Sequence, residues 1–173
     1  MVQYRRSRIA GGTFFFTVNL RDCHDALLCE HVNALRGIVR NVRAMLPFTI
    51  DAMVVLPDHS HAVWTLAPGD ADYARRMRLI KARFTRYLTG GGMAIAKDAR
   101  GDYAFWQKRI REHTIRDERD FEAHVNYVHI NPVKHGYVAR AADWPHSTIH
   151  RYIKTGVLSA EWACSPHAGE FGE

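Results

Sequence analysis

The sequence predicts an α+β fold in which a four-stranded antiparallel sheet carries two helices on one face and is followed by a further helix and a C-terminal tail. Short stretches rich in aromatic and β-branched residues alternate with longer stretches whose apolar residues recur at steps of three and four. Their order is β, α, β, β, α, β, which is the ferredoxin-like order. The length of 173 residues suits one domain with a substantial core.

The first strand and the first helix follow from composition and spacing. The segment "TFFFTVNL", Thr13 to Leu20, comes after a Gly-Gly turn and has the composition of a buried strand. A helix is expected from about Ala26 to Met45, and Pro47 closes it. Its apolar stripe consists of Leu28, Val32, Leu35, Val39 and Val42.

The next segment, "FTIDAMVVLPDHSHAVWTLA", predicts a β-hairpin. Phe48 to Leu56 forms one arm, Pro57 and Asp58 form the turn, and the second arm begins at His59. Side chains two residues apart on a strand point the same way, so His59 and His61 share one face of the sheet. Two neighbouring imidazoles can share a metal ion, although a hydrogen-bonded histidine pair at a strand edge is the alternative.

A second helix and a fourth strand complete the predicted sheet. The helix is expected over residues 72–88, with an apolar stripe of Met77, Ile80, Phe84, Tyr87 and Leu88. A glycine-rich loop follows it. The segment "FWQKRIREHTI", residues 105–115, has no helical stripe and is expected to be a strand with basic side chains.

A third helix is expected from about residue 116, where acidic residues suit a helix N-terminus. His124, Tyr127 and Asn131 lie at i, i+3 and i+7, so they line one face of it. Pro132 disfavours helical geometry at Asn131 and is expected to end or kink the helix there. Taken singly, Tyr127 can be a half-buried ring and Asn131 a boundary residue.

Charge indicates a polyanionic partner. The chain has 24 Lys and Arg against 18 Asp and Glu, a net charge of +6 with neutral histidines. No apolar run is long enough to span a bilayer, and no hydrophobic segment follows the basic N-terminus, so a cytosolic protein is expected. Three cysteines without a CxxC pair argue against a disulfide framework.

Several segments together resemble the HUH single-tyrosine transposases, and more narrowly the REP-associated tyrosine transposases of bacteria. These segments are "GGTFFFTVNL", "VVLPDHSHAVWTL", "WQKRIREHTIRD" and "YVHINPVKHGYV". The similarity extends from Gly11 to about Tyr152. It implies one ferredoxin-like catalytic domain, over residues 1–143, that nicks and rejoins single-stranded DNA with a divalent metal. Residues 144–173 are then a C-terminal tail that contacts DNA or is partly disordered.

The resemblance also implies the roles of individual residues. His59 and His61 correspond to metal ligands, Tyr127 to the nucleophile and Asn131 to a third protein ligand. The metal is Mg²⁺ or Mn²⁺, which acts as a Lewis acid on the scissile phosphate. Attack by the tyrosine gives a 5′-phosphotyrosine and a free 3′-hydroxyl. Ser60 departs from the apolar residue that the family has between its two histidines.

Other residues are candidates for supporting roles. His113, Glu112 and His124 are candidates for orienting or proton-handling groups, and a regular strand turns Glu112 and His113 to opposite faces, which favours His113. A basic groove with aromatic rings suits single-stranded DNA. The candidate DNA-binding residues are Arg75, Arg78, Lys81, Arg83, Lys108, Arg109 and Arg111.

The resemblance implies single-stranded hairpin DNA of the REP type as the partner, a nucleoid-associated bacterial location, and a monomer or homodimer. Two other functions remain open at this point. A non-catalytic ferredoxin-like module that binds RNA or DNA would explain the basic surface alone. A metal-dependent nuclease that activates water would cut DNA without becoming attached to it.

Overall fold

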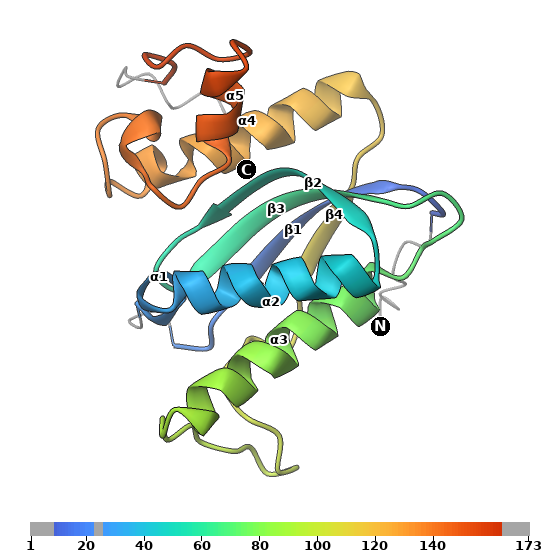
Figure 1. The fold of residues 1–173 in the computed structure, drawn as a ribbon, viewed down its shortest axis with the longest axis vertical. Helices are drawn as coiled ribbons and strands as arrows, with labels where there is room; N and C mark the ends of the chain where they lie inside the picture. Colours follow the sequence, from blue (N-terminus) through green and yellow to red (C-terminus); the bar gives the residue numbers. More distant parts are fainter. Residues whose placement is uncertain (1–8, 23–25, 164–173) are drawn as a thin grey trace, which may run out of the picture.

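The computed structural model describes residues 9–22 and 26–163. Four strands form one antiparallel sheet in the order β2-β3-β1-β4 (Figure 1), and they are β1 (Thr13–Asn19), β2 (Phe48–Val55), β3 (His59–Leu66) and β4 (Arg111–Thr114). The helices are α1 (Leu27–Glu30), α2 (Val32–Met45), α3 (Tyr73–Gly90), α4 (Glu118–Lys134), a 3-10 turn (Ala141–Asp143) and α5 (Ile149–Lys154). The predicted four-stranded antiparallel sheet is confirmed.

The two faces of the sheet bury different helices. α2 and α3 cover one face, and α4 lies on the other (Figure 1). Alternate residues of β1, such as Phe14 and Phe16, point toward α2 and α3 and are fully buried there with Trp64 of β3. Val63 and Val54 point to the other face and pack with Val125 and Val128 of α4. The two-residue period of the strands therefore sorts the side chains between two cores.

The first predicted helix is divided in two. His31 has φ −107° and ψ 25°, outside the helical region, and separates α1 from α2. The backbone N–H of Leu28 donates to the carbonyl of Pro57 at 3.1 Å, and the Leu28 side chain is buried. α1 is thus held by the turn between β2 and β3.

The fourth strand is shorter than predicted. Residues 105–110 form no regular strand, although Trp106 makes an isolated bridge to Leu20 and the N–H of Gln107 donates to the carbonyl of Asn19 at 3.0 Å. Phe105 is buried in the core beneath α2 and α3. The indole Nε1 of Trp106 donates to Thr85 Oγ1 at 3.0 Å. Only Arg111–Thr114 pairs with β1, so the prediction of a strand over 105–115 was wrong for its first half.

The third predicted helix continues through Pro132. α4 ends at Lys134, and Gly136, with φ +71°, follows its C-terminus. A proline this close to a helix end removes one hydrogen bond, and burial of the Pro132 and Ile130 side chains offsets that loss. The expected helix end at Asn131 was therefore wrong, because Asn131 lies within α4, whereas a kink there stays a prediction.

The segment after α4 packs along the free edge of β2. The N–H of Val55 donates to the carbonyl of His146 at 2.9 Å, and the N–H of Thr148 donates to the carbonyl of Met53 at 2.8 Å. Within the predicted tail, residues 144–163 are described and include α5, whereas residues 164–173 lie outside the described part. A domain boundary at residue 143 stays a prediction. No helix in residues 9–22 or 26–163 has the length and apolar character needed to cross a membrane.

His129 of α4 predicts how stability depends on pH. Its side chain is fully buried against Thr148 Oγ1, 3.0 Å from Nε2, and burial, with a smaller effect of Arg151, lowers its pKa to about 4. The unfolded side chain titrates near 6.5, so between about pH 6.5 and pH 4 the unfolded state binds the extra proton. The contribution of neutral His129 to the free energy of unfolding is therefore fully present above about pH 6.5. It is lost as the pH falls toward 4, by up to roughly 1 kcal/mol per pH unit.

Urea unfolding of wild type and His129→Gln at about pH 7.5 and about pH 5.5 measures this effect. The wild type is expected to lose more stability on acidification than the variant, because Gln carries no titrating group. Equal losses in the two proteins would contradict the assignment.

Candidate active site

A pair of buried histidines lies on β3, on the face covered by α4. His59 is 9% exposed and His61 is 4% exposed, and their ring centroids are 5.0 Å apart. The ring of His61 lies 5.2 Å from the ring of Tyr127 on α4. The strand alternation thus places both imidazoles together between the sheet and the helix.

Each imidazole is oriented by a hydrogen bond at Nδ1. His59 Nδ1 lies 2.7 Å from Asp58 Oδ1, and His61 Nδ1 lies 2.9 Å from Thr17 Oγ1. A partner at one ring nitrogen fixes the ring and leaves the other, Nε2, for a metal ion. Burial, followed by the neighbouring His59, lowers the pKa of His61 to about 3, so near neutral pH this imidazole is uncharged, the form that binds metals.

Tyr127 and Asn131 lie one helical turn apart on α4. The Tyr127 ring is half-buried, with the phenyl ring of Phe15 at 5.7 Å and the ammonium of Lys134 at 4.8 Å from its centroid. Asn131 is 1% exposed, and its Oδ1 has no hydrogen-bond partner among the described residues. An unsatisfied buried acceptor costs about 1–3 kcal/mol, and a cation would satisfy it. Two imidazoles and an amide oxygen fit a divalent metal ion.

His135 is a neighbour of this site that sequence reasoning missed. Its ring centroid lies 5.0 Å from that of His59. Burial and the nearby His59 lower its pKa below the usual value. The signal was the four-residue spacing of Tyr127, Asn131 and His135, and the expected helix end at Pro132 concealed it.

His113 and His124 come together, but around a carboxylate rather than around His59 and His61. His113 Nε2 lies 2.8 Å from Asp120 Oδ2, and His124 Nδ1 lies 3.0 Å from Asp120 Oδ1. In the described part of the chain these three residues form the one group of three or more His, Cys, Asp or Glu side chains close enough to share a metal ion. Glu112 points to the opposite face, where it accepts a hydrogen bond from the Tyr73 hydroxyl at 2.8 Å.

A basic groove of about 2390 Å³ lies between α3 and residues 98–111. Five of the seven candidate DNA-binding residues line it: Arg78, Lys81, Lys108, Arg109 and Arg111. Arg21, Arg86 and Arg100 add further positive charge, and the ring of Trp106 lies among them. The groove therefore combines cations with aromatic surface, as single-strand binding requires.

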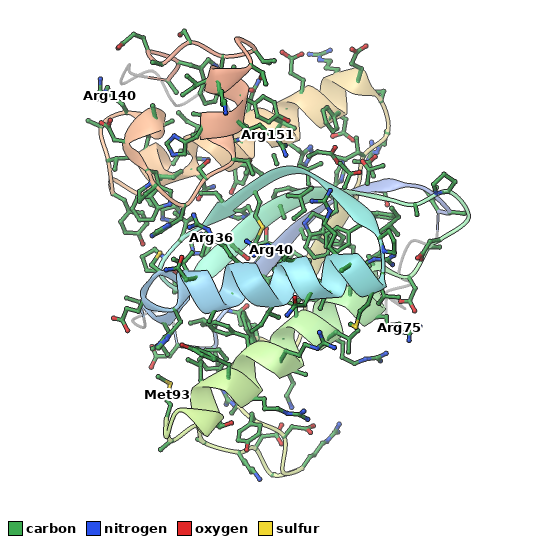
Figure 2. The ribbon with its side chains drawn as sticks, viewed as in Figure 1. Arg36, Arg40, Arg75, Met93, Arg140 and Arg151 are labelled. Atoms are coloured by element: carbon green, nitrogen blue, oxygen red, sulfur yellow. The ribbon has the colours of Figure 1, made fainter. Side chains whose placement is uncertain are left out.

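Three arginines of α3 lie outside this groove. The Arg83 side chain turns toward α2, where Nη2 lies 3.5 Å from Met45 Sδ. Arg75 is near the beginning of α3, at the opposite end of the helix from Met93 (Figure 2). Arg76 is buried and binds Asp70 Oδ2 at 2.6 Å, so it is a structural residue. Arginines that are close together in the sequence of α3 therefore lie on different sides of the helix, and only some of them reach the groove.

Lys81 lines the groove, and its side chain is partly buried there. Its ammonium donates to the carbonyl of Gln107 at 2.9 Å and lies 5.5 Å from the centroid of the Trp106 ring. Burial lowers its pKa to about 8. A bound phosphate would favour the charged form, so Lys81 is suited to respond to an anionic ligand.

Known proteins resemble this chain over nearly its whole length. A REP-associated tyrosine transposase of Escherichia coli is 45% identical over 163 residues, 94% of this chain and 92% of its own length. A Haemophilus influenzae protein provisionally assigned to the same family is 36% identical over 168 residues, 96% of each chain. No family model matches the chain.

A solved structure supports the same relationship. It is that of a REP-associated tyrosine transposase bound to a REP hairpin, with a TM-score of 0.84 and 42% identity. The match covers 100% of this chain and 98% of that one. Identity at this level over most of both proteins shows common descent as well as a common fold. The chain therefore belongs to the REP-associated tyrosine transposases.

Proposed function

We propose that this protein cleaves single-stranded DNA next to REP-type hairpins and transfers strands through a covalent 5′-phosphotyrosine at Tyr127. The observation that carries the proposal is the packing of the Tyr127 ring 5.2 Å from His61, beside the buried histidine pair. The family relationship and the hairpin bound by the 42% identical relative support the same substrate.

His59, His61 and Asn131 would hold the divalent ion. Mg²⁺ and Mn²⁺ both accept such ligands, imidazole favouring Mn²⁺, and either would supply Lewis-acid activation of the phosphate when bound. Asp58 and Thr17 keep the two imidazoles in orientation through their Nδ1 atoms. The unsatisfied Oδ1 of Asn131 offers an oxygen ligand one turn beyond the nucleophile.

Tyr127 supplies the attacking oxygen. Its Oη forms a bond to phosphorus while the bond from phosphorus to O3′ breaks, and the proton that the phenol loses to solvent is balanced by the one that O3′ takes up to become the 3′-hydroxyl. The Lys134 ammonium, 4.8 Å from the ring centroid, places positive charge where a phenolate develops. The new ester retains the phosphodiester energy, so a 3′-hydroxyl can reverse the step and rejoin DNA without ATP.

The basic groove would hold the DNA on its way to Tyr127. Arg111 lines the groove and pairs in register with Thr17 of β1, which in turn bonds His61 of β3. Two strand spacings separate these backbones, roughly 10 Å. The groove lies on the α3 side of the sheet and the histidine pair on the α4 side, so DNA that leaves the groove at Arg111 would pass around the edge strand β4 to reach Tyr127.

Neutralising the groove should weaken DNA binding and its salt dependence. Arg78→Ala and Arg109→Ala are each expected to reduce the slope of log K against log salt by about 0.7–0.9 for each DNA phosphate that the protein no longer neutralises. Fluorescence anisotropy with a labelled hairpin at several salt concentrations measures this slope. Arg83→Ala is the matched control, because it removes the same charge from the same helix outside the groove. Equal slopes for Arg78→Ala and Arg83→Ala would exclude the groove as the binding surface.

The reaction itself is tested with a 5′-labelled and a 3′-labelled single-stranded hairpin taken from repeats that flank the gene. Incubation with Mg²⁺ or Mn²⁺ should give cleaved DNA and a protein band that carries label in a denaturing gel. The label on the protein should come from the fragment with the 5′-phosphate. Cleavage without any attached protein would instead support a nuclease that uses activated water.

A further inference from the structure

We propose that His113, Asp120 and His124 form a second divalent metal site, suited to Zn²⁺ and separate from His59 and His61. Each of the three residues offers one ligand atom, and these atoms all lie within 4.8 Å of one another. The inference does not depend on which residue attacks DNA. It concerns a cluster that the proposed reaction does not use.

The donor set matches the chemistry of zinc. Two imidazoles and one carboxylate, with a fourth position open to water, are a frequent ligand set for Zn²⁺. His113 Nε2 and His124 Nδ1 lie 2.8 Å and 3.0 Å from the Asp120 carboxylate oxygens. Tetrahedral Zn²⁺ holds its ligand atoms roughly 3.4 Å apart, so each histidine nitrogen would move away from the carboxylate oxygen by about half an ångström.

The cluster is also held in place from several directions. The backbone N–H of Arg116 donates to Asp120 Oδ2 at 2.9 Å, which fixes the carboxylate at the start of α4. The rings of His113 and His124 lie nearly parallel, with centroids 4.5 Å apart. All three side chains are partly exposed, so an ion can reach them. Without an ion, His113 Nε2 bonds the Asp120 carboxylate, and His124 Nδ1 also lies 2.8 Å from the backbone carbonyl of Asp120, a hydrogen bond that metal binding at Nδ1 would replace.

One phenyl ring lies next to both sites. The Phe15 ring centroid is 4.8 Å from that of His124 and 5.7 Å from that of His61. The hydrogen bonds of His113 and His124 go to Asp120, whereas that of His61 goes to Thr17. The two histidine groups are therefore neighbours with different partners, and an ion in one need not share ligands with the other.

A metal at this position would connect β4 to the first turns of α4. His113 belongs to β4, and Asp120 and His124 belong to the helix that carries Tyr127 one turn further on. A coordinate bond from each element would hold that end of α4 on the sheet. The site would thus stabilise the orientation of the helix without touching the substrate.

Zinc titration of the full-length, metal-free protein tests the proposal. His59→Ala/His61→Ala serves as the background, because any remaining site is then outside the histidine pair of β3. Calorimetry is expected to give one bound Zn²⁺ in this background. Adding His113→Gln or His124→Gln should weaken Zn²⁺ binding by about tenfold or more, since a ligand contributes at least as much as a group that orients one.

His150→Gln in the same background is the matched control, because His150 is an exposed histidine on α5 whose Nε2 lies 2.8 Å from the Trp144 carbonyl. Its Zn²⁺ affinity is expected to stay unchanged. Circular dichroism checks that each variant is folded, and if the background does not fold, the wild type should bind one Zn²⁺ more than His113→Gln. No Zn²⁺ binding in the folded background, or binding that neither His113→Gln nor His124→Gln weakens, would show a hydrogen-bonded network only.

Discussion

Replacing either histidine of β3 is expected to abolish DNA cleavage while leaving DNA binding nearly intact. His59→Ala and His61→Ala each remove an imidazole from the proposed metal site, and loss of several kcal/mol of charge stabilisation corresponds to roughly a 100-fold to 10 000-fold lower rate. Affinity should change little, because the proposed phosphate contacts lie in the groove along α3, away from both histidines. Single-turnover cleavage and anisotropy measure the two effects separately.

Two controls accompany this prediction. Asn131→Ala should reduce the rate less than His61→Ala does, since water can replace an amide oxygen as a ligand. Excess EDTA should stop wild-type cleavage, and added Mn²⁺ should restore it. Full activity in EDTA, or in His61→Ala, would remove the basis for metal-dependent cleavage.

Tyr127→Phe is expected to eliminate the covalent complex between protein and DNA. The substitution removes one oxygen and keeps the ring that packs with Phe15, His61 and the Lys134 ammonium. Stability should therefore change by less than about 1 kcal/mol. The adduct should disappear because no other group at this position can form the ester. A denaturing gel with labelled DNA detects it.

Tyr137→Phe is the matched control for this substitution. Tyr137 is 43% exposed and stacks against His135 with a centroid distance of 5.7 Å, close to the site but outside α4. It is expected to form the adduct at the wild-type rate. If Tyr127→Phe still became attached to DNA, another residue would have to be the nucleophile.

The sequence predicted the histidine pair well because a strand has a strict two-residue period. His59 and His61 had to share a face wherever β3 lay in the sheet, and Val63 follows them on that face toward α4. The same alternation turned Glu112 and His113 to opposite sides of β4. These conclusions needed only local geometry.

The rest of the site depends on contacts between distant segments. Burial of the residues around Pro132 outweighs the local preference against helix at Asn131, and this extends α4 far enough to bring His135 next to His59. Asp120 looked like an ordinary acidic residue at a helix start. Its meeting with His113 requires the pairing of β4 with β1, which sequence spacing does not reveal.

The arginines of α3 illustrate the same limit. Composition marked the helix as basic, and the helical phase sets the side on which each residue lies, but only the packing of α2 and residues 98–111 decides what each side meets. Arg78 thereby lines the groove, Arg83 turns to Met45, and Arg76 is buried on Asp70. A charge cluster in sequence therefore predicts a class of partner better than it predicts the contacting residues.

The central claim is that Tyr127 becomes joined to the 5′-phosphate of cleaved DNA, and peptide mapping of the covalent complex tests it most directly. Trypsin should release residues 120–134 as one peptide, whose single tyrosine is Tyr127. After nuclease trimming, mass spectrometry is expected to find the nucleotide mass on this peptide and to localise it to Tyr127. A nucleotide on a different peptide, or cleaved DNA with no modified peptide at all, would contradict the account.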